Sequence, residues 1–454
     1  MNLLVVFTAL LAGSLAPLNS TMIVVALPQI LADLGASLTW GSWVIVSYLV
    51  AMAAMQPLGG SLGDRFGRKR LVILGLAFFL VSSLAAALAT SVQAVIAART
   101  AQAISGAITL PNGSALVRTL VPRELQGRAL GLIGTGIGAA AAFGPPLGGL
   151  ITDAFGWRWI FLANVFVVLP AIVLALRLPR SVVRAGPGRF DLLGGALLLV
   201  ALVGLSLAAT VWRVPGVPVA GPVVLALAGG AAAVWFWRHA RTSPAPILDL
   251  GLFARRGFLP AGLTVMFSNM TMYAIFLAVP LFVAQVLGWP PREVGLLLSA
   301  LSVPMLLLGP VAGWFADRYG TRLPALAGCV VAVVGVVLFT FVGADWSRGD
   351  LLLPLITVGV GMGLSSAPVH TAALQAARHE EAGRAAGLFS TMRYVGSISC
   401  SAGIAAVLGA SGAVAEYRLL FVLLVGAAAV AVLTSSRLPA SLVPPAAAAR
   451  AGEA

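Results

Sequence analysis

PLGGSLGDRFG, at Pro57–Gly67, occurs a second time in the chain as PVAGWFADRYG at Pro310–Gly320. The two copies lie 253 residues apart, and a proline, two glycines, an aspartate and an arginine match between them. One sequence unit is therefore used twice. With small gaps, the same alignment pairs Pro28 with Pro280, Pro111 with Pro368, and Gly127–Ala129 with Gly383–Ala385, at offsets of 252, 257 and 256 residues.

Long apolar runs surround both copies. Hydrophobic residues make up 60% of the 454 residues and charged residues only 9%, against about 25% charged residues in a typical soluble domain. A membrane-spanning helix needs about 20 apolar residues, and we identify fourteen such runs between Leu3 and Leu433. The composition therefore predicts an all-α polytopic membrane protein and excludes a water-soluble globule of this size.

The repeat and the runs together predict a domain organisation. Two six-helix bundles, residues 1–180 and 257–436, flank two inserted helices within residues 181–256, and residues 437–454 form a short cytoplasmic tail. Chance can supply one matching stretch, but a register that holds across several helices indicates duplication. Parallel repeats of this kind place a substrate site near the middle of the bilayer and rock against each other around it.

Basic residues divide unequally between the loops. With the amino terminus in the cytoplasm, the inner loops carry 21 of the 28 basic residues and the outer loops carry five, while Arg99 and Arg393 lie inside spans. The positive-inside rule therefore places both termini in the cytoplasm and requires an even number of spans. This asymmetry accounts for most of the net charge of +14, so we expect no nucleic-acid partner.

Four sets of segments carry recognisable motifs: Leu18–Thr21 with Ala26–Pro28 (helix 1), Gly60–Lys69 (the loop after helix 2), Arg99–Gln102 with Gly106 (helix 4), and Gly144–Gly149 followed by Trp157–Phe161 (helix 5 and after). Together they resemble motifs of the major facilitator superfamily, and specifically of its fourteen-helix drug:proton antiporters. The resemblance implies a bacterial exporter of small drug-like or antibiotic-like molecules that is driven by protons. One departure concerns Asn19, because the family commonly has an aspartate at this position.

The resemblance assigns both copies of the repeated stretch to a cytoplasmic gate. Glycines there allow a sharp turn and close helix approach, and an aspartate at a helix end can bind an arginine or a neighbouring helix N-terminus. The alternative is a solvated loop that only follows the positive-inside rule. The gating motif consists of Gly60, Asp64, Arg65, Gly67, Arg68, Asp317 and Arg318, and the antiporter motif of Gly144, Pro145, Gly148 and Gly149.

Arg99 and Arg393 are the two charges inside spans. An unpaired guanidinium in hydrocarbon is costly, so each should face a cavity, a partner or a substrate. The alternative is that each side chain snorkels to the membrane surface. All fourteen carboxylates fall at helix ends or in loops, so none lies in the middle of the membrane. Asp33, at the outer end of the first span, is the nearest candidate partner of Arg99.

Polar side chains in the spans complete the expected substrate cavity. His370 is the only histidine inside a span, and an unperturbed pKa near 6.5 would let it carry a proton. The alternative is that His370 only lines the cavity or forms a hydrogen bond between two helices. The expected cavity residues are Asn19, Tyr48, Arg99, Gln102, Asn112, Asn269, Tyr273, His370 and Arg393, and the candidates for proton coupling are Asp33 and His370.

The sequence predicts a secondary active exporter of small amphipathic molecules, neutral or anionic, in the bacterial cytoplasmic membrane. Its expected partners are the substrate, protons and the lipid bilayer, and we expect a monomer. A lipid or metabolite translocase of the same fold without proton coupling is the alternative. We expect no enzyme activity, metal site or cofactor, because His370 stands alone and no Gly-x-x-x-x-Gly-Lys nucleotide loop is present.

The topology can be tested by cysteine labelling with a membrane-impermeant reagent. A cysteine introduced beside Arg348 should react from outside the cell, because the charge distribution places that loop on the outer face. A cysteine beside Arg184 should stay unlabelled until the membrane is permeabilised. The reverse pattern would overturn the orientation.

Overall fold

The computed structural model describes residues 3–179, 191–212, 217–244, 246–378, 381–408 and 413–440. These residues form fourteen α-helices, one short 3-10 helix (η1) and no strand, which confirms the predicted all-α class. Eleven of the helices are long and apolar enough to cross a membrane. The helices are α1 (Leu3–Asp33), α2 (Leu38–Phe66), α3 (Arg68–Ala87), α4 (Val92–Leu120), α5 (Arg123–Phe155), α6 (Arg158–Leu176), α7 (Leu192–Val211), α8 (Ala220–Thr242), η1 (Leu250–Ala254), α9 (Phe258–Gln285), α10 (Pro291–Tyr319), α11 (Arg322–Phe339), α12 (Arg348–Gln375), α13 (Ala382–Val407) and α14 (Val414–Ser435).

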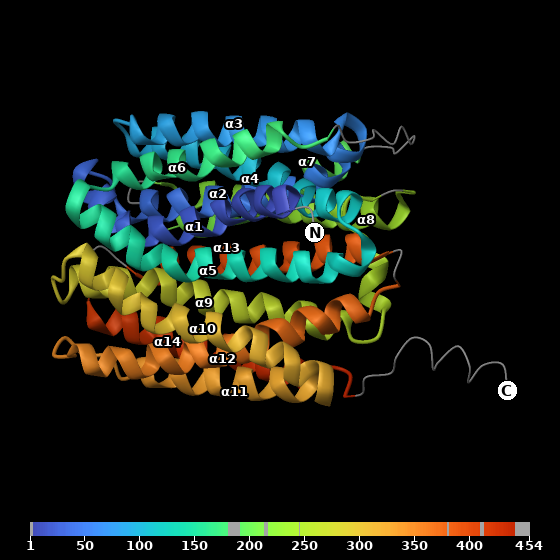
Figure 1. Cartoon of the computed structure of the whole chain (residues 1–454). Helices are drawn as coiled ribbons and strands as arrows, with labels where there is room; N and C mark the ends of the chain where they lie inside the picture. Colours follow the sequence, from blue (N-terminus) through green and yellow to red (C-terminus); the bar gives the residue numbers. More distant parts are fainter. Residues whose placement is uncertain are drawn as a thin grey trace.

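The helices form two groups. Helices α1–α6 pack on one another, as do α9–α14, and Figure 1 shows the first group above the second. The groups meet mainly where α5 lies against α10 and α2 against α13. The domain boundaries drawn from the sequence remain a prediction.

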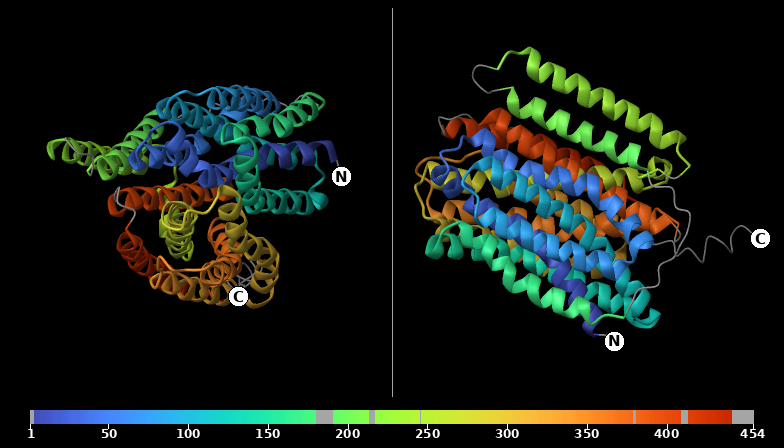
Figure 2. Two further views of the ribbon diagram at one scale, coloured as in Figure 1. Left: turned by 90° about the vertical axis from the view of Figure 1, so that its left-hand side faces the viewer. Right: turned by 90° about the horizontal axis from the view of Figure 1, so that it is seen from above.

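Helices α7 and α8 stand to one side of both groups, as Figure 2 shows. Helix α7 contacts α2 of the first group and α13 of the second, while α8 packs mainly on α7. The two helices approach closely, because a Cβ added at Gly204 would lie 3.0 Å from the Cα atom of Gly229. In lipid, such small-residue contacts replace the hydrophobic effect as the source of helix association.

Asp191 joins α7 and α8 at the end of the pair that the distribution of basic residues places in the cytoplasm. Its carboxylate accepts hydrogen bonds from the backbone N–H groups of Gly194 and Ile247, both 2.9 Å away, and lies 2.6 Å from Nε2 of His239. Burial by itself would raise the pKa of Asp191, but these partners hold its pKa below the ordinary value. The start of α7, the end of α8 and the following linker therefore meet at one side chain.

The sequence repeat reappears in the backbone. Gly67, between α2 and α3, and Gly320, between α10 and α11, have φ angles of +91° and +85°. Gly35 and Gly288, in the loops after α1 and α9, have φ angles of +59° and +70°. Each pair is 253 residues apart, and glycine adopts positive φ without the steric cost that other residues meet. The duplicated unit therefore has the same turns in both copies.

The antiporter motif forms the contact between the two groups on α5. A Cβ added at Gly149 would lie 2.5 Å from the carbonyl oxygen of Pro291 and 3.0 Å from the Cα atom of Gly295 on α10. Gly148 likewise lies against Met22 of α1, where an added Cβ would be 2.8 Å from the Met22 carbonyl oxygen. The glycines therefore let α5 pack directly on the backbones of α1 and α10.

Substituting Gly149 tests whether this seam stabilises the protein. Gly149→Val should lower the unfolding temperature and cost about 1–3 kcal/mol, because the added side chain meets backbone that cannot move aside. Gly134→Ala is the matched control on the same helix, since an added Cβ there meets nothing within 4 Å. We would measure thermal unfolding of the purified variants. Equal stability of Gly149→Val and wild type would refute the close-packed seam.

Candidate functional site

Arg99 lies fully buried on α4 and is held by neutral side chains. Its exposed fraction is 0%, as are those of Asn19 on α1 and Gln102 one turn further along α4. Nη1 of Arg99 donates to Oδ1 of Asn19 and, over 3.3 Å, to Oε1 of Gln102. Both acceptors are amide oxygens, so these hydrogen bonds orient the guanidinium without neutralising its charge.

Tyr48 of α2 covers one face of the same guanidinium. The guanidinium carbon lies 4.2 Å from the centre of the tyrosine ring, well within the range of a cation–π interaction. The hydroxyl of Tyr48 donates to the carbonyl oxygen of Ala16 on α1 at 3.3 Å, which fixes the ring. Three helices, α1, α2 and α4, therefore position Arg99.

A second layer of polar side chains fixes Gln102. Its Nε2 donates to Oγ of Ser83 on α3 at 2.8 Å, and Nδ2 of Asn164 on α6 donates to the same oxygen at 3.2 Å. Ser83 and Asn164 were not among the residues selected from the sequence. Both lie in strongly apolar helices. Their polarity within an apolar run was the only feature of the sequence that could have pointed to them.

The second helical group supplies aromatic and charged side chains near this cluster. The hydroxyl of Tyr273 on α9 lies 3.4 Å from Oγ of Ser20 on α1, the residue after Asn19. Arg393 of α13 stacks on Tyr394, with its guanidinium carbon 5.2 Å from the ring centre. Arg99 therefore lies close to the boundary between the two groups.

Three other predicted cavity residues lie apart from Arg99 or bond locally. Nδ2 of Asn112 donates to the carbonyl oxygens of Gly59 and Ile108, both at 2.7 Å, about 20 Å further along α4 at 1.5 Å per residue. Asn269 donates to the carbonyl of Val265 on its own helix, at 3.2 Å. His370 is exposed on α12, and its ring centre lies 5.2 Å from that of Phe389. Asn112 therefore joins α2 to α4 instead of lining a site with Arg99.

Asp33 is not the partner of Arg99, and that expectation was wrong. Its carboxylate accepts from Nε1 of Trp157 at 3.0 Å and pairs with Nη1 of Arg158 at 2.7 Å. This cluster borders a small hollow of about 160 Å³ at the end of α1. The cause is distance along the helix: Asp33 ends α1, whereas Asn19 lies four turns earlier and faces Arg99.

The gating motif lies at the turns between α2 and α3 and between α10 and α11. Arg68 donates from Nη1 to the carbonyl oxygen of Ala115 at 3.1 Å, which ties α3 to α4. Arg65 and Arg318 stack beside aromatic rings, Arg65 5.6 Å from Phe66. Gly60 lies inside α2, six residues before its end, whereas Asp317 lies in the last turn of α10 and Gly67 separates α2 from α3. The side chain of Asp64 lies outside the part of the chain that the structure describes.

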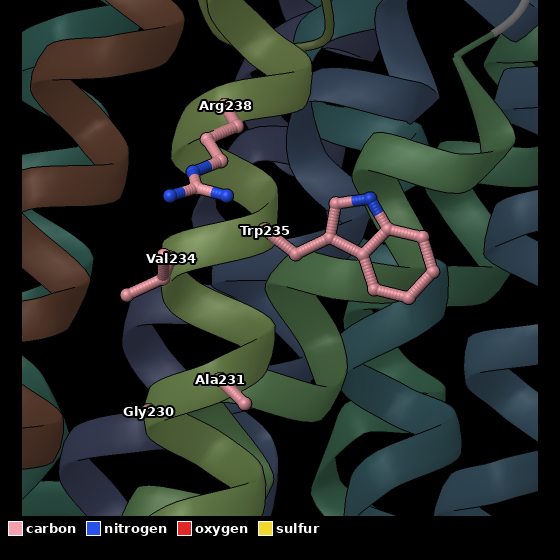
Figure 3. Close-up of a pocket in the computed structure, with 5 residues that line it drawn as sticks. All are labelled: Gly230, Ala231, Val234, Trp235 and Arg238. Atoms are coloured by element: carbon pink, nitrogen blue, oxygen red, sulfur yellow. The ribbon is translucent and has the colours of Figure 1, made fainter.

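A separate hollow of about 510 Å³ lies on the outer face of α8, as Figure 3 shows. Gly230 and Ala231 form its floor beside Val234, Trp235 and Arg238. Val234 and Trp235 are 57% and 58% exposed, so this surface faces the surrounding lipid. We do not include it in the candidate site, because its five lining residues all belong to α8, which packs mainly on α7.

Comparison with known proteins agrees with this architecture. The sequence profile of the Major Facilitator Superfamily matches residues 9–401. The uncharacterized MFS-type transporter YvkA of Bacillus subtilis is 31% identical over 431 residues, which cover 95% of this chain and 94% of that protein. The multidrug resistance protein Stp of Mycobacterium tuberculosis is 30% identical over 395 residues, covering 87% of this chain and 73% of that protein.

A solved structure shows the same fold at low sequence identity. The crystal structure of a D-xylose–proton symporter superposes with a TM-score of 0.67, covering 96% of this chain and 97% of that one at 15% identity. At this identity the likeness concerns the arrangement of the helices alone.

Substituting Ser83 tests the second polar layer. Ser83→Ala should destabilise the protein by about 1–3 kcal/mol, because Gln102 and Asn164 would lose their shared buried acceptor. Ser82→Ala is the matched control, since the Ser82 hydroxyl bonds only to the carbonyl of Phe78 on its own helix, at 2.7 Å. Thermal unfolding of both variants provides the measurement. A control as unstable as Ser83→Ala would contradict a specific role for the layer.

Proposed function

Because the chain belongs to the Major Facilitator Superfamily, we propose that it is a secondary active exporter of small amphipathic molecules, coupled to proton antiport through alternating access. It is a multi-pass membrane transporter, not an enzyme. Its place in the bacterial cytoplasmic membrane, with both termini inside, belongs to the proposal and follows from the distribution of basic residues. The kinship with a multidrug resistance protein supports drug-like substrates.

The observation that carries the proposal is the buried, unneutralised charge of Arg99. Its hydrogen-bond partners are the neutral amides of Asn19 and Gln102, and a guanidinium keeps its proton in proteins. A lipophilic cation entering this site would meet a like charge without a negative partner, which is costly in a desolvated interior. Neutral and anionic amphiphiles are therefore the substrates we propose.

Proton coupling has two candidate residues in this proposal. Asp33 lies in an ion pair with Arg158, at the end of α1. His370 lies exposed on α12, and histidine is the side chain that ordinarily titrates near neutral pH. Neither is part of the Arg99 cluster, so the proton and the substrate would bind at different places. The cytoplasmic gate is assigned to Asp64 and its neighbours in the repeated stretch.

One observation favours a second candidate, a translocase or facilitator of the same fold without proton coupling. Every described carboxyl residue lies in the first or last turn of a helix, at a helix cap or in a loop. Proton-driven transporters commonly carry ionisable residues within the membrane. Transport that ignores a pH gradient would favour this alternative.

The proposal is tested with purified protein in proteoliposomes under an imposed pH gradient. We expect gradient-driven transport of naphthalene-2-carboxamide or naphthalene-2-carboxylate, and no transport of the permanent cation tetraphenylphosphonium. The variants His370→Ala and Asp33→Asn identify the proton carrier, since the gradient dependence should weaken in one of them between about pH 5.5 and 8. Efficient transport of the cation by the wild-type protein would refute the proposed substrate charge.

A further inference from the structure

Three buried hydrogen-bond donors in the Arg99 cluster have no partner among the described residues. They are Nε and Nη2 of Arg99 and Nδ2 of Asn19. The polar atoms of Gln102 and the hydroxyl of Ser83, in contrast, all have partners. Buried polar groups are nearly always hydrogen-bonded in folded proteins. All three unpartnered atoms are donors, so a ligand that satisfies them must supply hydrogen-bond acceptors.

The two unpartnered atoms of Arg99 lie on one edge of its guanidinium. Nε and Nη2 present two parallel N–H bonds, the fork that matches the two oxygens of a carboxylate. Nη1, away from this edge, is already occupied by Asn19 and Gln102. The amide partners therefore hold the guanidinium in an orientation that leaves the carboxylate-binding edge open.

The described residues place no carboxylate at this edge. All described acids lie at helix ends, caps or loops, and Glu380 and Glu453 lie outside the described residues. Arg99 lies in the second turn of α4 beside a residue in the middle of α1. Charged side chains within a membrane usually have a charged or polar partner, so an anionic ligand would complete the surroundings of Arg99.

The surroundings of Arg99 specify the remainder of that molecule. Tyr48 covers one face of the guanidinium at 4.2 Å, and Tyr273 of the other helical group reaches Ser20, the residue after Asn19, at 3.4 Å. Arg393, stacked on Tyr394, forms no ion pair or side-chain hydrogen bond with a described residue and adds a second positive charge. Aromatic rings favour offset or edge-on packing against one another, so an aromatic anion suits this environment.

We propose that Arg99 binds an aromatic carboxylate through its Nε–Nη2 edge, with Nδ2 of Asn19 as a third donor. The inference rests on the proposed function, because this carboxylate is taken to be the exported substrate. Arg99 is fully buried in the present arrangement. Access therefore requires the two helical groups to part at contacts such as Ser20–Tyr273.

The test measures equilibrium binding to purified full-length protein, without any gradient. Naphthalene-2-carboxylate should bind at least about tenfold more tightly than naphthalene-2-carboxamide at pH 7, as expected for charge-assisted hydrogen bonds. Arg99→Lys keeps the charge but loses the fork, and should abolish most of this preference. Asn19→Asp should abolish it as well, because the introduced carboxylate neutralises Arg99 in place. Arg241→Gln, which removes an exposed charge on α8, is the control and should bind as wild type.

Several outcomes would overturn the inference. Equal affinity for the carboxylate and the amide in wild-type protein would do so, and this comparison needs no variant to fold. Loss of carboxylate binding in millimolar chloride would identify a simple halide site instead. Unchanged preference in both Arg99→Lys and Asn19→Asp would place the carboxylate elsewhere. Gradient-driven export without carboxylate preference would leave the proposed function intact, whereas carboxylate binding without export of either naphthalene compound would refute that function and keep the site.

Discussion

The absence of water inside a lipid bilayer is the constraint on which this structure depends. Backbone N–H and C=O groups must be satisfied within each segment there, which leaves the helix as the form available to a chain of this composition. Apolar side chains gain little by leaving lipid for protein, so helices associate through close contact. The glycines at positions 149 and 295 serve this purpose where α5 meets α10, and Gly204 and Gly229 do so between α7 and α8.

Arg99 is the exception to this apolar interior. Its surroundings suit a residue that binds a ligand better than one that stabilises the fold. A buried charge is normally paired with an opposite charge, yet the partners of Arg99 are amides and an aromatic ring. Ser83 and Asn164 extend the network to α3 and α6, so side chains of five helices contribute to orienting Arg99. The protein therefore orients the Arg99 guanidinium and leaves its Nε and Nη2 atoms without a hydrogen-bond partner among the described residues.

The duplication explains the framework but not the site. Matching glycine turns at positions 67 and 320, and contact between Ser20 and Tyr273 at the repeat spacing of 253 residues, show that both copies keep one backbone plan. Arg99 has no counterpart in the second copy, because the spacing of Pro111 and Pro368 places Ile356 at the matching position. The two halves therefore share the same turns between helices, while the buried charge of Arg99 belongs to the first half alone.

The sequence by itself determined the all-helical membrane class, the number of helices, the repeat and the identity of Arg99 and Gln102 as buried polar residues. Hydropathy, charge asymmetry and proline or glycine spacing are local properties, and each can be counted along the chain. The tertiary structure decided which side chains meet: Arg99 contacts Asn19 and not Asp33, Asn112 joins α2 to α4, and Ser83 enters the network. These contacts depend on how each helix is rotated and how far it is shifted against its neighbours. Packing between helices distant in sequence sets those quantities, and no single helix encodes them.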